Sequence, residues 1–209
     1  MKNNLPVLSL RCLALGLFLP FVSVAQSAYG IQAGLNLSDA TVQGPTPFVS
    51  SPQGNYFLGL QAHHPLNVHW AISSDAQYTK RGFFLNQVKS ATENRLGIQL
   101  AYVDLATKME YTVFKNIGLQ LGAYTGFRLD EHIQLVGSNQ WEKSTIPQTD
   151  QWDLGLQVGV VARFQRWSAF ARYNHGVKTV ARQEITDQVE VVKLYNRGLQ
   201  MGASYDLFN

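Results

Sequence analysis

The chain has almost no cysteine and little charge. Cys12 is its only cysteine, so the 197 residues that follow carry no thiol for a disulfide or a zinc–thiolate site. Cys12 also precedes the nearest apolar run, whereas a lipid-modified cysteine would follow one. Charged residues make up 15% of the chain, with 17 basic against 14 acidic, where a soluble domain usually has about 25%. The near balance gives no reason to expect a nucleic-acid partner.

Long hydrophobic runs are also missing. The most apolar run, Cys12 to Ala25, has 14 uncharged residues, whereas a membrane-spanning helix needs about 20. This run follows a basic start and ends on small residues, which is typical of a secretory signal peptide. We therefore predict a signal peptide over residues 1–25, cleaved before Gln26, and one domain over residues 26–209 that is exported through the inner membrane.

What the chain does have is alternation with a period of two residues. From Trp152 to Val160 every even position is apolar and every odd position is polar or glycine. This pattern is typical of a β-strand with two different faces. It recurs in eight segments, at residues 29–38, 55–64, 68–81, 98–113, 117–130, 151–163, 167–177 and 193–207.

The connections between these segments alternate in length. Short ones fall at residues 65–67, 114–116 and 164–166; long ones, which hold much of the proline, serine and threonine, fall at residues 39–54, 82–97, 131–150 and 178–192. Tight turns at one end and long loops at the other are how outer-membrane barrels are built. We predict an all-β fold, an eight-stranded antiparallel up-and-down transmembrane β-barrel, present as a monomer in the outer membrane.

Alternation alone does not say which face points inward, because a soluble lipocalin-type barrel turns its apolar face to the interior. The polar face here holds many glycines, which suits a narrow and crowded lumen and would weaken a solvated outer face. We therefore expect Leu121 and Leu156 to face lipid, and Gln120 and Gln157 to face the lumen.

The charges on the polar face nearly balance, six acidic against five basic. Unpaired charges in a closed lumen would be unstable, whereas mutual partners make a tolerable network. We predict a lumen charge network made of Asp75, Arg81, Asp104, Lys108, Glu110, Arg128, Asp130, Asp153, Arg163, Arg172 and Asp206.

Aromatic residues gather near the ends of the predicted strands. Rings at the two membrane interfaces are expected to anchor a barrel there. The residues concerned are Trp70, Tyr78, Tyr102, Tyr111, Phe127, Trp152, Trp167 and Tyr173.

Several motifs, taken in order, resemble a known family. The segment from Gly30 to Ser38 resembles the opening strand of the PorT-like outer-membrane β-barrel family, and further similar motifs lie at residues 77–82, 102–105, 122–127, 171–174 and 196–202. Together they span nearly the whole predicted domain. The resemblance implies a porin-like barrel in the outer membrane of a Gram-negative bacterium, and it implies no particular activity, because a fold does not give a function.

Candidate chemistry is sparse. Neighbouring residues on a strand point to opposite faces, so His63 and His64 are not expected to chelate one metal ion. Outer-membrane lipid-modifying enzymes set serine and histidine near the outer rim, and Ser73, Ser74 and His175 are available here, although no spacing selects them. We predict no catalytic residue, no metal and no cofactor.

The expected function is therefore a structural or binding role through the long extracellular loops. The alternatives are a periplasmic lipocalin-like binding barrel and an outer-membrane lipid-modifying enzyme; an open pore is disfavoured because side chains fill an eight-stranded lumen. The expected partners are outer-membrane lipid and the barrel-assembly machinery, with no nucleic acid and with an extracellular ligand that the sequence does not name.

Overall fold

The computed structural model describes residues 27–43, 48–87, 95–134, 140–144, 149–185 and 190–208. The signal peptide expected over residues 1–25 lies outside this part of the chain. The strands are β1 (Ala28–Gln43), β2 (Phe48–Pro65), β3 (Trp70–Gln87), β4 (Arg95–Phe114), β5 (Ile117–Gln134), β6 (Glu142–Lys143), β7 (Trp152–Phe164), β8 (Trp167–Gly176), β9 (Ala181–Ile185) and β10 (Glu190–Phe208).

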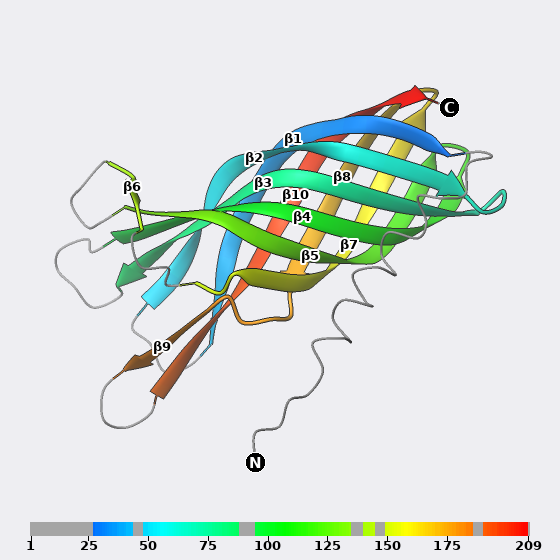
Figure 1. Cartoon of the computed structure of the whole chain (residues 1–209). Helices are drawn as coiled ribbons and strands as arrows, with labels where there is room; N and C mark the ends of the chain where they lie inside the picture. The colour runs from blue at the N-terminus through cyan, green and yellow to red at the C-terminus, as the bar shows by residue number, and fades with distance from the viewer. Residues whose placement is uncertain are drawn as a thin grey trace, which may run out of the picture.

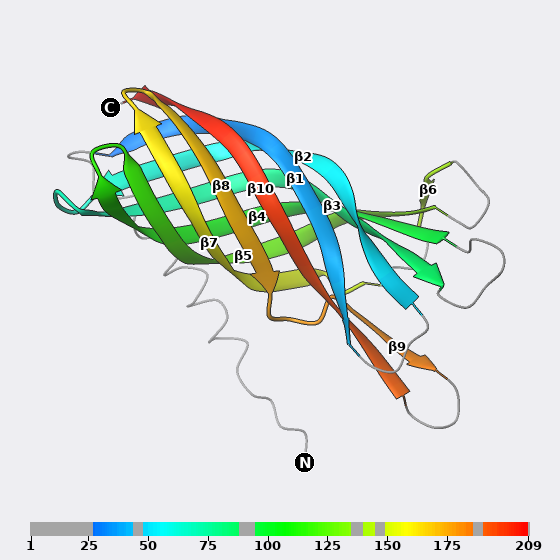
Figure 2. The ribbon, with the colours of Figure 1, turned by 180° about the vertical axis from the view of Figure 1, so that it is seen from behind.

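Eight of these strands close a ring. They lie in the order β1, β2, β3, β4, β5, β7, β8, β10, and β10 pairs back with β1; every pairing in the ring is antiparallel. The two short strands lie outside it, with β6 paired to β5 and β9 paired to β10 (Figures 1 and 2). The predicted eight-stranded antiparallel barrel is therefore confirmed. In the described residues, no helix has both the length and the apolar character to cross a membrane.

Several strands are longer than predicted at one end. At the short turns their bounds agree with the prediction to within two residues, but at the other end β2 begins at Phe48, β3 continues to Gln87 and β5 continues to Gln134. The predicted long loops were therefore wrong in part, because residues 39–43, 48–54, 82–87, 95–97 and 131–134 continue the sheet. Figure 1 shows these strand ends, with β6 and the β9–β10 hairpin, projecting beyond the barrel.

The wall of the barrel is apolar on the outside. Leu121 is 65% exposed and Leu156 is 53% exposed, whereas their chain neighbours Gln120 and Gln157 are each 2% exposed and point inward. The predicted phase is thus confirmed, and the soluble lipocalin-type alternative, which needs the opposite phase, is wrong. An outer surface of this kind has no favourable contact with water and suits a lipid surrounding.

The strand ends that project beyond the barrel, which we call the extension, have the opposite arrangement. On β3 the inward-facing residues change from the charged Arg81 to the apolar Phe83, and on β1 they change from the polar Ser38 to the apolar Ala40. The interior of the extension is one buried apolar cluster, made of Ala40, Phe83, Ile98, Leu100, Tyr102, Val180 and Leu194. The barrel therefore has a polar lumen inside an apolar wall and, above it, an apolar core like that of a soluble sheet protein.

Aromatic pairs lie on the outside at both ends of the wall. Near the short turns the ring centroids of Trp70 and Tyr111 are 4.8 Å apart, and Trp167 lies 4.9 Å from Tyr205. At the other end Phe127 packs against Trp152 at 5.0 Å. Tyr102 was also expected among them, and this was wrong: it is fully buried and faces the interior.

Candidate functional site in the barrel lumen

One charged group of the interior is built around Arg81 on β3. Its guanidinium forms ion pairs with Asp104 of β4 and Asp153 of β7. It also lies between two aromatic rings, 4.9 Å from the centroid of Tyr102 and 4.8 Å from that of Tyr124. Both carboxylates are buried. This triad therefore joins three strands around one cation.

A second triad has the reverse composition. The carboxylate of Asp75 on β3 pairs with the ammonium group of Lys108 on β4 and, at 2.7 Å, with the guanidinium of Arg172 on β8. One triad has two acids around a base and the other has two bases around an acid, so their charges balance when taken together. This balance is what the lumen needs, because buried charges are tolerated only with partners.

Glycines on the neighbouring strands make room for the two long cations of this triad. Gly122 is the register partner of Lys108, and a Cβ added to it would lie 2.6 Å from Lys108 Cγ. Gly159 faces Arg172 in the same way, with 2.8 Å to Arg172 Cγ. The glycine-rich polar face noted in the sequence therefore accommodates large lumen side chains.

Three buried glutamines connect the charged groups into one network. Gln32 donates to Gln77 at 3.3 Å, and Gln77 donates to Asp104 at 3.4 Å. Arg172 contacts Gln32 at 3.5 Å and donates to Gln120 at 3.0 Å, and Gln120 in turn donates to Glu110 at 2.9 Å. Gln120 was predicted on the inner face, but no glutamine was predicted in the network.

Glu110 and Arg163 form the ion pair at the short-turn end, at 2.7 Å. Ser73 donates to Glu110 at 3.2 Å and lies 3.2 Å from His63 Nδ1. Serine, histidine and carboxylate thus meet here, but Arg163 lies 3.0 Å from the same His63 Nδ1 and also holds the carboxylate. A nucleophile relay needs the base to contact serine and acid through different ring nitrogens, so this cluster is arranged as an ion-pair network.

The other residues proposed for chemistry lie apart from one another. His64 contacts Ser27 through Nδ1 at 2.9 Å, on a different side of β2 from His63. Ser74 lies on β3 near the short turns beside Thr107, whereas His175 lies at the other end of β8, stacked on Tyr173. Within the described ranges, no three histidine, cysteine or acidic side chains are grouped so that they could hold a metal ion.

Two members of the predicted network lie near the ends of the lumen. Asp206 accepts a hydrogen bond from Gln61 at 2.9 Å near the short turns. At the long-loop end Arg128 forms an ion pair with Glu131 and donates to the carbonyl of Thr149 at 2.6 Å. Glu131 fell in the predicted long loop, yet it lies on β5 and is buried.

Asp130 was predicted in the lumen, and this was wrong. The pairing of β4 with β5 shifts at this point, because Ala101 faces Asp130 and Tyr102 faces Arg128, which leaves Leu129 as an extra residue. Such a bulge reverses the alternation beyond it, so Asp130 points outward and Glu131 inward. On the outside, a hydrogen bond from Lys143 holds the pKa of Asp130 below its ordinary value.

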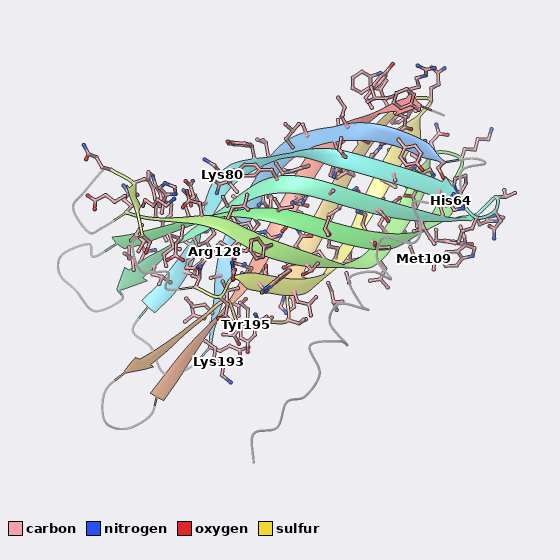
Figure 3. All side chains as sticks on the ribbon, in the orientation of Figure 1. His64, Lys80, Met109, Arg128, Lys193 and Tyr195 are labelled. Carbon is pink, nitrogen blue, oxygen red and sulfur yellow. The ribbon has the colours of Figure 1, made fainter. Side chains whose placement is uncertain are left out.

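A lumen filled in this way serves packing and ion pairing. Its charged groups have partners on adjacent strands and across the lumen, and its long side chains fill the space that an eight-stranded ring encloses. Figure 3 shows side chains along the whole length of the barrel, with His64 and Met109 toward the short turns and Arg128 toward the extension.

Comparison with known proteins agrees with this geometry. Residues 24–182 match a family model described as "Outer membrane protein beta-barrel domain". The chain belongs to this family. The outer surface of this outer-membrane barrel therefore faces lipid. Barrels of this kind generally have short turns on the periplasmic side and long loops outside the cell, and we expect the same orientation here.

Solved structures of other outer-membrane barrels are similar in fold. Neisserial surface protein A is 16% identical with a TM-score of 0.50, and the alignment covers 88% of this chain and all of that one. Ail of Yersinia pestis, in complex with a heparin analogue, is 15% identical with a TM-score of 0.43 over 87% of this chain and all of that one. OmpW of E. coli is 10% identical with a TM-score of 0.38 over 88% of this chain and all of that one. No curated protein sequence is significantly similar to this chain.

Proposed function

We propose that this protein is a non-enzymatic outer-membrane barrel, of the PorT-like kind, that holds a rigid extracellular binding platform. The observation that carries the proposal is the extension. Its strands continue past the lipid-facing wall and enclose an apolar cluster that includes Phe83, Leu100 and Leu194. A barrel needed only as a membrane anchor has no use for a second folded core above the membrane. A rigid scaffold for loops is the common basis of recognition surfaces.

The contents of the barrel support a closed lumen. The triads around Arg81 and Asp75 join β3, β4, β7 and β8 across the interior, and the apolar cluster follows directly above them. We therefore expect no steady conductance when the purified protein is inserted into planar lipid bilayers. Stable single-channel steps would instead favour a small pore.

Among the described residues, Ser73, His63 and Glu110 meet in an ion-pair network with Arg163, and this arrangement supports a non-enzymatic role. Purified protein incubated with outer-membrane lipids is expected to release no fatty acid and to transfer no acyl chain. Reproducible product that is lost on Ser74→Ala or His175→Ala would overturn this part of the proposal.

Binding through the loops is tested by shortening them. We compare the wild-type barrel in lipid nanodiscs with a variant in which residues 135–148 are replaced by a short glycine–serine turn. Both are presented to an array of soluble polysaccharides and extracellular proteins, after protease protection has shown equal insertion. We expect the wild type to bind array members that the variant does not bind, and equal binding by both would contradict the platform.

A further inference from the structure

The outer wall changes character within one row of residues. Register places Tyr78, Val103, Phe127 and Trp152 side by side on β3, β4, β5 and β7, and all four face outward. The next row toward the extension contains Lys80, Ala101 and Asp130. Aromatic rings followed directly by charged groups mark the level of the lipid headgroups on the extracellular side.

A hollow lies in the wall at this level. It has a volume of about 170 Å³ and is lined by Tyr78, Lys80, Gln99, Ala101, Asp130 and His132. Ala101 gives it depth, because this small residue lies in register between Lys80 and Asp130. The bulge at Leu129 gives it its acidic side, because without the reversal Asp130 would not face outward. The hollow is thus a product of the local strand register.

The charged groups around the hollow differ in whether they have an ion-pair partner. The carboxylate of Asp130 has a partner in the ammonium group of Lys143, at 3.2 Å, and lies 3.9 Å from His132. The ammonium group of Lys80 lies 5.5 Å from the ring centroid of Tyr56, and none of the ion pairs among the described residues includes it. Figure 3 shows Lys80 on the outside of the barrel toward the extension. One cation therefore remains available to an anion at the headgroup level.

We propose that this hollow binds the phosphorylated sugar headgroup of an outer-leaflet glycolipid. The phosphate contacts Lys80, while sugar hydroxyls donate to the carboxylate of Asp130 and contact the amide of Gln99. The inference rests on the outer-membrane position of the proposed function and adds a ligand class for a site outside the loops.

Two related ligands fit less well. A free phosphate ion would be repelled by Asp130, which lines the same hollow. A phospholipid with an ammonium headgroup would need an unpaired carboxylate, but Asp130 already has Lys143 as its partner. Neutral hydroxyl groups use the remaining acceptor positions of a carboxylate without adding charge.

The test measures glycolipid binding by native mass spectrometry and by thermal unfolding of the barrel. The protein is first folded into phosphatidylcholine nanodiscs, and protease protection establishes insertion. Bisphosphorylated lipid A, its dephosphorylated form, phosphatidylethanolamine and inorganic phosphate are then added separately. We expect the wild type to bind the phosphorylated glycolipid at least tenfold more tightly than the other three.

Three variants locate the site. Lys80→Gln is expected to remove the preference for the phosphorylated glycolipid, and Asp130→Asn is expected to weaken binding of both glycolipids. Lys115→Gln removes an exposed lysine at the periplasmic turn between β4 and β5, and it should change nothing.

An unchanged preference in Lys80→Gln, or wild-type binding that is as tight for phosphatidylethanolamine or inorganic phosphate, would overturn the site. These outcomes are distinguishable from failure of the proposed function, because a protein that does not insert fails at the protease step.

Discussion

Identical aspartates have very different surroundings in this molecule. Asp75 is buried in the lumen between Lys108 and Arg172, whereas Asp150 pairs with Lys178 at 3.4 Å and both of these side chains are well exposed. An exposed pair is screened by water and contributes about 0–1 kcal/mol. A buried pair matters mainly because removal of one partner leaves the other as an uncompensated buried charge.

This difference predicts unequal effects of the same substitution. Asp75→Asn leaves two buried cations without their shared carboxylate and should lower the free energy of unfolding by about 3–5 kcal/mol. Asp150→Asn should lower it by no more than about 1 kcal/mol. Denaturant titrations of both variants in lipid vesicles measure the comparison, and equal losses would mean that water reaches Asp75.

Depth in the membrane also separates like residues. Leu121 and Leu129 both lie on β5 and are 65% and 53% exposed on the outer side, but Leu129 lies beyond the aromatic row that contains Phe127. Leu121→Arg should lower the stability in vesicles by about 2–4 kcal/mol, and Leu129→Arg by about 0–1 kcal/mol. The pair shares residue type, strand and substitution. A larger loss for Leu129→Arg would move the membrane boundary away from that row.

At the level of elements, the alternation in the sequence was enough to predict the eight strands and their inward and outward faces. In a regular period-two segment such as Trp152 to Val160, the face of every side chain is determined once the apolar residues face lipid. The extension was not predicted, because its strands continue the alternation with apolar residues on the inner face in place of polar ones. On β3 this change falls between Arg81 and Phe83, which both face inward. A prediction that requires polar residues inward and apolar residues outward along the whole strand therefore ends the strand where this change occurs.

The lumen was predictable in membership but not in pairing. Strand parity alone puts Asp75, Lys108 and Arg172 on the inner face. Which acid meets which base depends on how far each strand is shifted along its neighbours, and one sequence does not contain that shift. The extra residue Leu129 has the same origin, and it made Asp130 the error in the predicted network.

The contact between β5 and β6 gives a pH-dependent prediction. Lys143 donates to Asp130 and holds its pKa below the ordinary value of an aspartate, which is about 3.9. A lowered pKa in the folded state means that the contact stabilises the protein above the ordinary pKa, and that this contribution is lost as pH falls through the lowered value. Lys143→Gln should raise the pKa of Asp130.

Titration of the Asp130 side-chain carboxyl by ¹³C NMR measures this shift. The titration midpoint in Lys143→Gln should lie closer to the ordinary value than in the wild type. Lys115→Gln, far away at the short turn between β4 and β5, serves as the control and should leave the midpoint where it was. A midpoint that is the same in all three proteins would show that Lys143 does not hold Asp130 in solution.

As a whole, the molecule has one part suited to lipid and one part suited to water. The wall presents leucines to lipid and keeps charges inside, while the extension presents polar groups to water and keeps Phe83, Leu100 and their neighbours inside. Truncating a leucine should therefore have different consequences in the two parts, because lipid fills a gap on the wall but nothing fills one in a packed core.

Leu100→Ala and Leu60→Ala test this division. Leu100 is fully buried in the extension, and Leu60 is exposed on the wall. Leu100→Ala should cost about 2–5 kcal/mol, which includes a cavity contribution, and should increase hydrogen exchange in the extension. Leu60→Ala should cost less, because only the transfer contribution is lost. Equal costs would mean that the cluster around Leu100 is loosely packed.

The pairing of β1 with β10 has a consequence for how the protein is made. Ala33 faces Ala203, so one edge of the first strand of the barrel is paired only by the last strand. Until residue 208 has been synthesised, both strands expose unpaired backbone groups, which lipid cannot satisfy and which invite pairing with other chains. Contacts this distant in the chain also form slowly. The nascent chain must therefore be kept from aggregating during its passage to the membrane, and closure of the β1–β10 seam is the step that ends this vulnerable period.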